Sequence, residues 1–494
     1  MMVPEINLTP QLEERVKARF GAEGVVSMHS GMTGPQRLKS WLAAHNGSAR
    51  IVLGTRMAVF ASMPHLKWIV VDEEHDASYK QQEGARYSAR DLAVYRARLE
   101  GAKVILGSAT PSLESWHQSR PANDGGRYMR LQMPARIGEG QLPFVRRVDM
   151  NHQPRKTVLS APLIAAIQER VAKGEQSMLL LNRRGYAPVL HCADCGWKSE
   201  CAHCSAFRVF HKIDRTLRCH HCGLTDRVPR HCPGCGDADL GMLGRGTEML
   251  EEQLAELLSG LTRPDGQAVR IARIDADSTR LQGALEQQLA QVHAGDVDIL
   301  VGTQMIAKGL HFPNVTLVGI VHADLSLHQA DFRAGERTFQ LLTQVSGRAG
   351  RGDVEGEVFV QSFTPFHPAI QYARRHDYLG FYEQEVEFRE QLRYPPVARV
   401  ALLTLKGRNE DKVKLFAEHL RKALDAGFKD WKDLILAGPA PAPLLKAESF
   451  FRHQIMLRTS AMSRLSIELG KIEQTFALPA DLTLIIDIDP VNLG

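Results

Sequence analysis

The segment WIVVDEEHDASYKQQEGARYSARDLAVYRARLEGAKVILGSAT, residues 68–110, decides the fold class of the first part of the chain. It holds two short apolar runs, and each ends in a polar loop: Asp72-Glu73-Glu74-His75 after the first and Ser108-Ala109-Thr110 after the second. The residues between them, 88–102, predict a helix with Gly101 as its stop and with an apolar face of Leu92, Tyr95 and Leu99.

A similar apolar run, IVLGT at residues 51–55, precedes this segment. Strands and helices in alternation predict a parallel sheet that is covered on both faces. Ligands of such sheets bind at the carboxyl ends of the strands, which is where these polar loops are expected.

The same pattern returns later in the chain. Residues 117–155 carry Gly, Pro and Arg without clear periodicity and are expected to link two lobes. Beyond them we predict helices at 162–173 and 248–258, and strands at 178–186, 297–305, 315–321 and 356–363. A cysteine-rich block interrupts this second α/β pattern, and a separate small α+β domain is expected from about residue 367.

Composition describes an ordinary soluble globular chain. Of its 494 residues, 44% are hydrophobic and 24% are charged. The N-terminus lacks a signal-peptide pattern, and no stretch approaches the ~20 apolar residues of a membrane span. We therefore expect a cytoplasmic protein with no membrane partner. The net charge is +5 and would fall to about +1 with eight thiolates and two Zn²⁺, so a nucleic acid would need a local basic track.

All eight cysteines lie between Cys192 and Cys235, in four C-x2-C pairs separated by five, fourteen and nine residues. Two tetrahedral zinc sites of four thiolates would use every ligand and leave no open position, so structural sites are expected. Gly196, Gly223 and Gly236 follow the second cysteine of a pair, where a positive φ is often needed. The alternatives are an iron–sulfur cluster or cysteines that bind no metal, and the spacing allows either a linear or a nested pairing.

Three motifs indicate a motor. An acidic pair such as Asp72 and Glu73 suits phosphoryl transfer, with one carboxylate on Mg²⁺ and the next orienting the attacking water. The SAT segment offers small hydroxyl groups that can couple a phosphate site to a neighbouring lobe. QVSGRAGR, residues 344–351, predicts two guanidinium groups on one side of a helix start, where they suit a γ-phosphate. Taken alone, the acidic pair has the alternative of a common strand-end loop, and QVSGRAGR that of a Gly/Arg surface loop. The order of all three motifs on two α/β lobes favours the motor.

DEEH, SAT and QVSGRAGR match motifs II, III and VI of superfamily 2 helicases. The whole chain resembles one family of these, the bacterial replication-restart helicases (PriA, or primosomal protein N′). The segments that carry the resemblance are VPEINLTPQ (3–11), HSGMT (29–33), IVLGTRMAVF (51–60), DEEHDASYKQ (72–81), LGSATPSLES (106–115), LNRRGYAP (181–188), the cysteine block, GRGTE (244–248), VGTQMIAKGLHFPNVTLV (301–318) and DFRAGERTFQLLTQVSGRAGR (331–351).

The resemblance implies an ATP-dependent DNA helicase that recognises stalled or forked DNA, unwinds it 3′ to 5′ and initiates primosome assembly. It implies Mg²⁺ with ATP and two structural Zn²⁺ as cofactors. The implied partners are forked or single-stranded DNA, primosome proteins and single-stranded DNA-binding protein. The implied fold is α/β: an incomplete RecA-like lobe 1 (1–118), a linker (119–160), a RecA-like lobe 2 (161–190 and 241–365), a zinc-binding insertion (191–240) and a small α+β C-terminal domain (366–494).

The resemblance also assigns residues. Asp72 and Glu73 would serve Mg²⁺ and water activation, and the ATP phosphates would be met from the second lobe by Gln344, Arg348 and Arg351. The implied DNA-binding residues are Thr55, Arg56, Tyr79, Lys80, Arg86, Tyr87, Thr303 and Gln304. The family pairs its cysteines in nested fashion, which implies one zinc on Cys192, Cys195, Cys232 and Cys235 and the other on Cys201, Cys204, Cys219 and Cys222.

The chain departs from the family in one respect. The family's G-x-x-x-x-G-K-[ST] loop and its N-terminal DNA-binding domains precede the VPEI segment, which begins here at Val3, and the loop motif occurs nowhere in the sequence. Without the amides and lysine of that loop, ATP affinity and turnover should fall severely.

We expect a fragment or late-start gene model of a full-length enzyme. The alternative is a short variant that acts as a non-catalytic DNA-binding and primosome-assembly platform. A zinc-ribbon protein of transcription or RNA processing is disfavoured, since it has no need of a second motor lobe.

Overall fold

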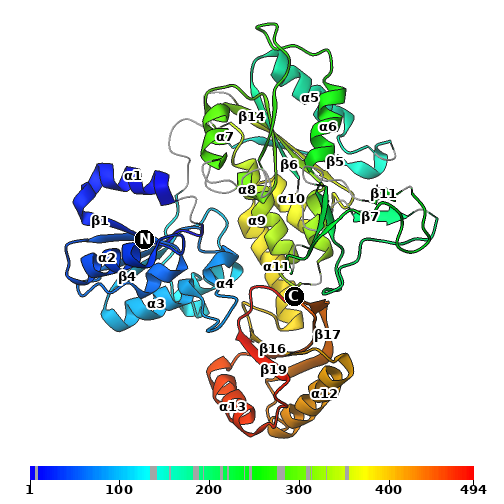
Figure 1. Cartoon of the computed structure of the whole chain (residues 1–494). Helices are drawn as coiled ribbons and strands as arrows, with labels where there is room; N and C mark the ends of the chain where they lie inside the picture. The colour runs from blue at the N-terminus through cyan, green and yellow to red at the C-terminus, as the bar shows by residue number, and fades with distance from the viewer. Residues whose placement is uncertain are drawn as a thin grey trace. The chain divides into compact units, whose positions relative to one another are not determined.

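The computed structural model describes residues 1–5, 9–133, 142–154, 157–181, 189–192, 194–211, 215–219, 222–238, 240–243, 247–274, 284–307, 312, 314–329, 331–350 and 355–493. These form two compact units, Met1–Leu131 with Asp487–Val491 and Gln132–Ile486 with Asn492–Gly494. Figure 1 shows the elements of both units in chain order, from blue to red. Within the described ranges, no helix combines the length and the apolar character that a membrane crossing requires.

A parallel sheet forms the centre of the first unit, as predicted. Strand β1 pairs with β2, and β3 pairs with β4, all in parallel. Met2 bridges to both Gly54 and Val71 and so joins the two pairs. The elements of this unit are α1 (Thr9–Phe20), β1 (Val25–Met28), α2 (Gly34–His45), β2 (Ile51–Gly54), the 3₁₀ turns η3 (Arg56–Phe60) and η4 (Ala77–Tyr79), β3 (Trp68–Val71), α3 (Ala89–Glu100), β4 (Lys103–Leu106), α4 (Leu113–Gln118) and two further 3₁₀ turns, η2 (Ala22–Gly24) and η5 (Ala122–Asp124).

Helix α3 begins and ends where the sequence predicts, but it packs through a different face. Ser88 caps its N-terminus through the Asp91 N–H, and Gly101 ends it in the left-handed conformation at φ 64°. The buried side chains are those of three alanines, whereas Tyr95 is 60% exposed and Leu99 68% exposed. Small side chains at four-residue spacing let the helix approach the sheet closely, so the predicted face of Leu92, Tyr95 and Leu99 is wrong for its last two residues.

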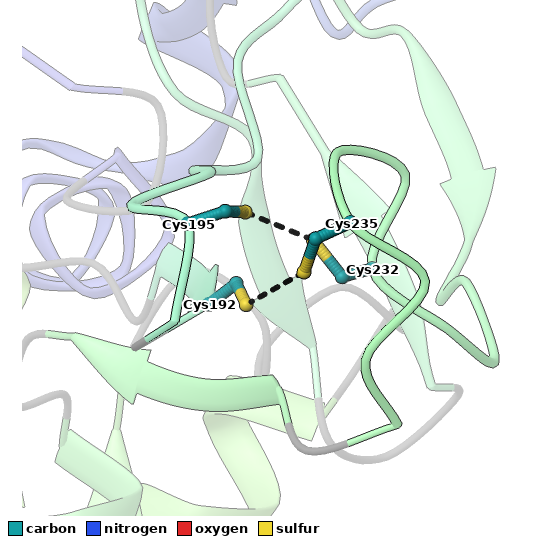
Figure 2. A group of neighbouring side chains, drawn as sticks. All are labelled: Cys192, Cys195, Cys232 and Cys235. Carbon is teal, nitrogen blue, oxygen red and sulfur yellow. Dashed lines mark hydrogen bonds between the residues drawn. The ribbon is translucent and has the colours of Figure 1, made fainter.

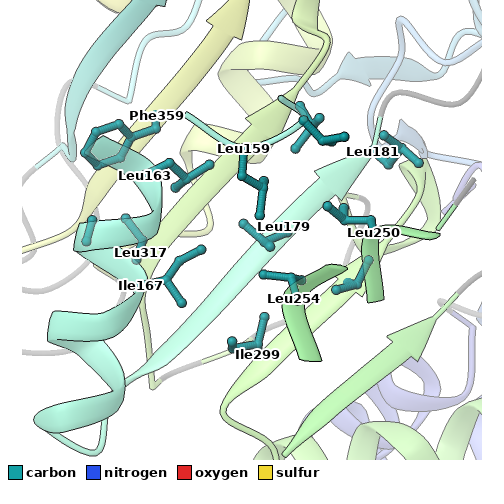
Figure 3. Close-up of a cluster of buried hydrophobic side chains, with 14 of the residues drawn as sticks. Leu159, Leu163, Ile167, Leu179, Leu181, Leu250, Leu254, Ile299, Leu317 and Phe359 are labelled. Atoms are coloured by element: carbon teal, nitrogen blue, oxygen red, sulfur yellow. The ribbon is translucent and has the colours of Figure 1, made fainter. Parts of the chain in front are cut away.

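The second unit contains a six-stranded parallel sheet in the order β12-β13-β6-β14-β15-β5. Its core gathers leucine, isoleucine, valine and phenylalanine side chains from the central strands and from helices α5 and α6 (Figure 3). The elements are β5 (Phe144–Asp149), η6 (Met150–His152), α5 (Ala161–Ala172), β6 (Gln176–Leu181), α6 (Thr247–Leu257), β12 (Ile271–Ile274), α7 (Ala284–His293), β13 (Ile299–Gly302), α8 (Gln304–Ala307), β14 (Val315–Val321), η7 (Ala323–His328), α9 (Ala334–Ser346), β15 (Glu357–Ser362), α10 (Pro368–Arg374) and α11 (Tyr378–Leu392).

Strand β5 lies inside the stretch that was expected to be a linker, 119–160. It pairs with β15 from Phe144 to Asp149 and forms the edge of the six-stranded sheet. Its sequence, FVRRVD, has two adjacent arginines, and an edge strand tolerates such charge because one of its sides faces solvent.

The cysteine block is a small antiparallel sheet in the order β10-β9-β8-β7-β11. The C-terminal domain has a sheet in the order β17-β18-β16-β19, with α12 packed against three of its strands. Helix α13 packs beside α12 (Figure 1). The remaining elements are β7 (Val189–Cys192), β8 (Val209–His211), β9 (Thr216–Arg218), β10 (Thr225–Arg227), β11 (Leu240–Leu243), β16 (Arg399–Gly407), α12 (Glu410–Gly427), β17 (Ile435–Ala447), β18 (Phe450–Thr459), α13 (Met462–Thr475) and β19 (Leu482–Ile488).

Candidate active site and metal centres

The acidic loop follows β3 directly, at the carboxyl end of the sheet. Asp72 Oδ1 accepts a hydrogen bond from the Glu73 N–H at 3.1 Å, and Glu73 itself has a left-handed backbone with φ 46°. Burial raises the pKa of Asp72, while the Glu73 N–H and His75 act to lower it. His75 Nδ1 lies 2.8 Å from Ser108 Oγ, which connects the loop to the SAT segment that follows β4.

Glu74 is a residue of this loop to which the sequence assigns no role. It is 2% exposed, and its carboxylate accepts hydrogen bonds from the Ser112 N–H at 2.6 Å and from Ser115 Oγ at 2.8 Å. Ser112 Oγ and Arg90 Nη1 donate to the same carboxylate at 3.0 and 3.2 Å. Glu74 therefore ties the acidic loop to the start of α4 and to α3. The pair of serines three residues apart in SLES is the signal that could have indicated a buried acceptor.

The residues expected to bind DNA beside this loop have internal contacts. Tyr79 is 2% exposed and donates its hydroxyl to Asp72 O at 2.6 Å, and burial raises its pKa. Lys80 is 3% exposed and pairs with Asp487 at 2.8 Å, and Arg86 reaches the same carboxylate at 3.5 Å. Tyr79 thus links this loop to Asp72, and Lys80 links it to Asp487.

The other residues implied for DNA contact in the first unit lie at the end of β2. Thr55 is 9% exposed, and Arg56 Nη1 donates to Ser78 O at 3.1 Å, which connects this strand end to the Tyr79 turn. Tyr87 is half-buried, and its ring packs edge-on against Phe60 with centroids 5.0 Å apart.

In the second unit, Thr303 follows β13 and Gln304 begins α8, and both are half-buried. Gln344 lies in the last turn of α9, which ends at Ser346 with Gly347 as its C-cap, and Arg348 is 6% exposed. QVSGRAGR therefore lies at the end of a helix, and the expected helix start is wrong, because Gly347 and Gly350 favour helix termination. Arg351 lies outside the described residues, so its position relative to Arg348 is untested.

The eight cysteines form two groups of four, which are the same sets that the family resemblance implies. In the first group, Cys192 Sγ lies 3.6 Å from Cys235 Sγ, and Cys195 Sγ lies 3.5 Å from Cys232 Sγ (Figure 2). Strands β7 and β11 pair side by side at the base of the block. This pairing brings together the first and last C-x2-C pairs, each of which forms a turn called a knuckle here. The two inner knuckles form the second group.

The geometry of both groups suits zinc. Within each group all sulfur atoms lie within 4.8 Å of one another, and tetrahedral Zn–S bonds of about 2.3 Å place sulfurs about 3.8 Å apart. Gly196, Gly223 and Gly236 have positive φ of 74°, 73° and 84°, as predicted. At Cys232, burial acts to raise the thiol pKa, but the N–H groups of Cys235 and Gly234 lower it to about 7. In the second group, burial raises the pKa of the Cys201 and Cys204 thiols.

Family models match four parts of the chain. They are described as DEAD/DEAH box helicase (residues 1–118), PriA DNA helicase Cys-rich region domain (201–227), Helicase conserved C-terminal domain (244–353) and Primosomal protein N C-terminal domain (390–491). Together with two RecA-like lobes that carry an acidic loop and a helix-end arginine, these matches place the chain in the DEAD/DEAH class of helicase-related proteins.

Curated relatives narrow the class. The replication restart proteins PriA of Treponema pallidum, Haemophilus influenzae and Bacillus subtilis are 38%, 40% and 39% identical over 100%, 100% and 99% of this chain. The chain spans 72%, 66% and 60% of their respective lengths. It belongs to the replication restart protein PriA family.

Among solved structures, the Mycobacterium smegmatis helicase Lhr bound to single-stranded DNA and AMP-PNP aligns with 76% of this chain. The match covers 42% of that protein, at 15% identity and a TM-score of 0.39. The family assignment rests on the sequence relatives alone.

Proposed function

We propose that this chain carries the motor lobes and the C-terminal domain of an ATP-dependent DNA helicase of replication restart. Such a helicase would recognise stalled or forked DNA, unwind it 3′ to 5′ and initiate primosome assembly. The observation that carries the proposal is the bond between His75 Nδ1 and Ser108 Oγ, which couples the acidic loop to the SAT segment at the carboxyl ends of adjacent parallel strands.

The chemistry assigned to these residues is phosphoryl transfer to water. Asp72 would hold Mg²⁺, which neutralises charge on the phosphates, and Glu73 would orient the attacking water. The hydrogen bond from the Glu73 N–H keeps the Asp72 carboxylate in place. Gln344, Arg348 and Arg351 would stabilise the phosphate charge from the second lobe.

The contact between the acidic loop and the Tyr79 turn supports a path from DNA to the nucleotide site. Tyr79 donates to Asp72 O, and Ser78 O accepts from Arg56 at the end of β2. A strand of DNA gripped near Thr55 and Arg56 would therefore act on Asp72 through one intervening turn. Thr303 and Gln304 would grip the same strand from the second lobe, and Lys80, Arg86 and Tyr87 would adjust the turn.

Forked DNA with either a 3′ or a 5′ single-stranded tail tests the proposal. The assay uses the protein expressed from the longest open reading frame that includes the codon for Met1. This choice is made because the 494 residues contain no G-x-x-x-x-G-K-[ST] loop. Unwinding should require ATP and Mg²⁺, should occur on the substrate that is entered 3′ to 5′, and should be lost in Asp72→Ala.

The second candidate is a non-catalytic platform that binds forks and recruits primosome proteins and single-stranded DNA-binding protein. Under that function, fork binding would be indifferent to ATP and to Asp72→Ala, and no unwinding would occur. That combination of results would overturn the helicase proposal.

A further inference from the structure

The turn that joins β17 to β18 in the C-terminal domain lies against the second cysteine group. Three consecutive residues of the knuckle bond to it in sequence. His203 O accepts from the Ser449 N–H at 2.7 Å, and the Ser205 N–H donates to Lys446 O at 2.8 Å. Between them, Cys204 Sγ accepts a hydrogen bond from the Glu448 N–H at 3.3 Å.

Lys446 adds two further contacts to the same knuckle. Its backbone N–H donates to Ser205 Oγ at 2.8 Å, and its Nζ donates to Ala202 O at 2.9 Å. Residues 202–205 thus contact the hairpin at every position, and one of these contacts reaches a sulfur atom.

The turn itself has a specific backbone shape. Glu448 and Ser449 have φ of 51° and 67° and form the two-residue loop between Ala447 and Phe450. Two left-handed residues in succession are typical of the type I′ turn that such hairpins favour, and in this turn the N–H groups of both residues donate to the knuckle.

We propose that Glu448 is an outer-shell residue of the second zinc site, supplied by the C-terminal domain. Zinc holds its cysteines as thiolates, and a thiolate accepts hydrogen bonds more strongly than a thiol. Metal bound by Cys201, Cys204, Cys219 and Cys222 would therefore strengthen the Glu448 N–H bond. It would also fix the knuckle that presents His203 O and the Ser205 N–H.

The coupling works in both directions, because linkage between two binding equilibria is reciprocal. Zinc at the second site holds the β17–β18 hairpin on the insertion, and the docked hairpin slows the loss of that zinc. At the first site, by contrast, the Gly234 N–H donates to Cys232 Sγ from within the insertion itself at 3.3 Å. The second zinc thus holds the cysteine block and the C-terminal domain as one body, and this role does not depend on the helicase activity proposed above.

Hydrogen exchange on the whole chain tests the first direction. A peptide covering residues 444–452 is followed in wild type, in Cys219→Ser at the second site and in Cys235→Ser at the first. The hairpin amides should exchange about tenfold faster or more in Cys219→Ser and at the wild-type rate in Cys235→Ser. Equal rates in the two variants would overturn the coupling.

Zinc release tests the reverse direction without changing any ligand. The double variant Ser205→Ala/Lys446→Ala removes three of the hairpin contacts, and Lys429→Ala serves as an exposed control in the same domain. With a chromophoric chelator, one of two zinc equivalents should leave several-fold faster in the double variant and at the wild-type rate in the control. If both zinc equivalents leave the double variant at the wild-type rate, the hairpin does not slow zinc loss and the coupling is overturned.

Discussion

Arg389 of α11 provides the sharpest test of how the helix that carries Gln344 is held. Its side chain is fully buried, and Nη2 lies 2.9 Å from the carboxylate of Glu336 on α9, which is 5% exposed. Nε pairs with Glu385 at 3.0 Å, and Nη1 donates to Pro395 O at 3.1 Å. The substitution Arg389→Met keeps the length of the side chain and removes its charge.

The size of the expected loss in stability follows from the buried Glu336 carboxylate, which Arg389→Met leaves without its partner. Breaking a buried ion pair by removing one partner costs about 3–5 kcal/mol, because the other charge stays buried without compensation. Each 1.4 kcal/mol changes an equilibrium about tenfold. The local opening of α9 should therefore become at least about a hundredfold more favourable. The exposed pair Lys173–Glu169 is the control, since such pairs contribute about 0–1 kcal/mol.

The loss of stability in Arg389→Met should also depend on pH. Burial raises the pKa of Glu385, Arg389 opposes that shift, and Glu336 adds to it, so the pKa should rise further in Arg389→Met. A carboxyl whose folded pKa lies above its unfolded value contributes stability that is fully present below the unfolded pKa and is lost as pH rises through the folded pKa. Lowering the pH from 7 toward about 5 should therefore restore part of the stability of Arg389→Met.

Hydrogen exchange of peptides within 334–346 measures this opening locally, which suits a chain of several domains that need not unfold in one step. Peptides from α9 should exchange much faster in Arg389→Met than in wild type, and at the wild-type rate in the control Lys173→Met. The double variant Glu336→Gln/Arg389→Met should recover much of the loss. An exchange rate in Arg389→Met equal to that of wild type would refute the reasoning. So would a double variant whose α9 peptides exchange faster than those of Arg389→Met.

Three further predictions follow from single contacts. Glu74→Ala leaves the buried Ser112 N–H without its acceptor, so exchange at the start of α4 should rise by the equivalent of about 1–3 kcal/mol, measured on peptides that begin at residue 112. Cys201→Ser should loosen the insertion and lower the zinc content by one equivalent while the motor lobes stay folded, and collapse of the whole chain in circular dichroism would contradict this. Tyr79→Phe should cost about 1 kcal/mol through loss of the bond to Asp72 O, yet leave single-stranded DNA affinity unchanged in an anisotropy titration.

Much of the fold could be predicted because the strands of a covered parallel sheet are continuous apolar runs. The runs at 51–55, 68–75 and 315–321 correspond to β2, β3 and β14. Strand β5 was missed because an edge strand with two arginines lacks that pattern. The buried face of α3 was misjudged because alanines decide how closely a helix approaches a sheet, whereas the larger Tyr95 and Leu99 dominate a hydrophobic pattern.

The candidate sites, too, could be predicted only in part. Spacing alone placed eight cysteines in metal sites but left the pairing open, and the pairing of β7 with β11 brings the outer knuckles together. Glu74 and the Glu448 N–H could not be predicted, since their roles depend on partners distant in the chain. Glu74 meets Ser112, and Glu448 meets Cys204, only once the chain has folded.

DNA-stimulated ATP hydrolysis is the most direct measure of the proposed motor. It is measured with Mg²⁺ on the longest product of the reading frame through Met1, in wild type, in Asp72→Asn and in the exposed control Asp124→Asn. We predict that single-stranded DNA stimulates hydrolysis in wild type and in Asp124→Asn, and that Asp72→Asn abolishes it with DNA binding intact. Hydrolysis that DNA does not change, or that survives Asp72→Asn, would contradict the assignment of this loop to a DNA-driven motor.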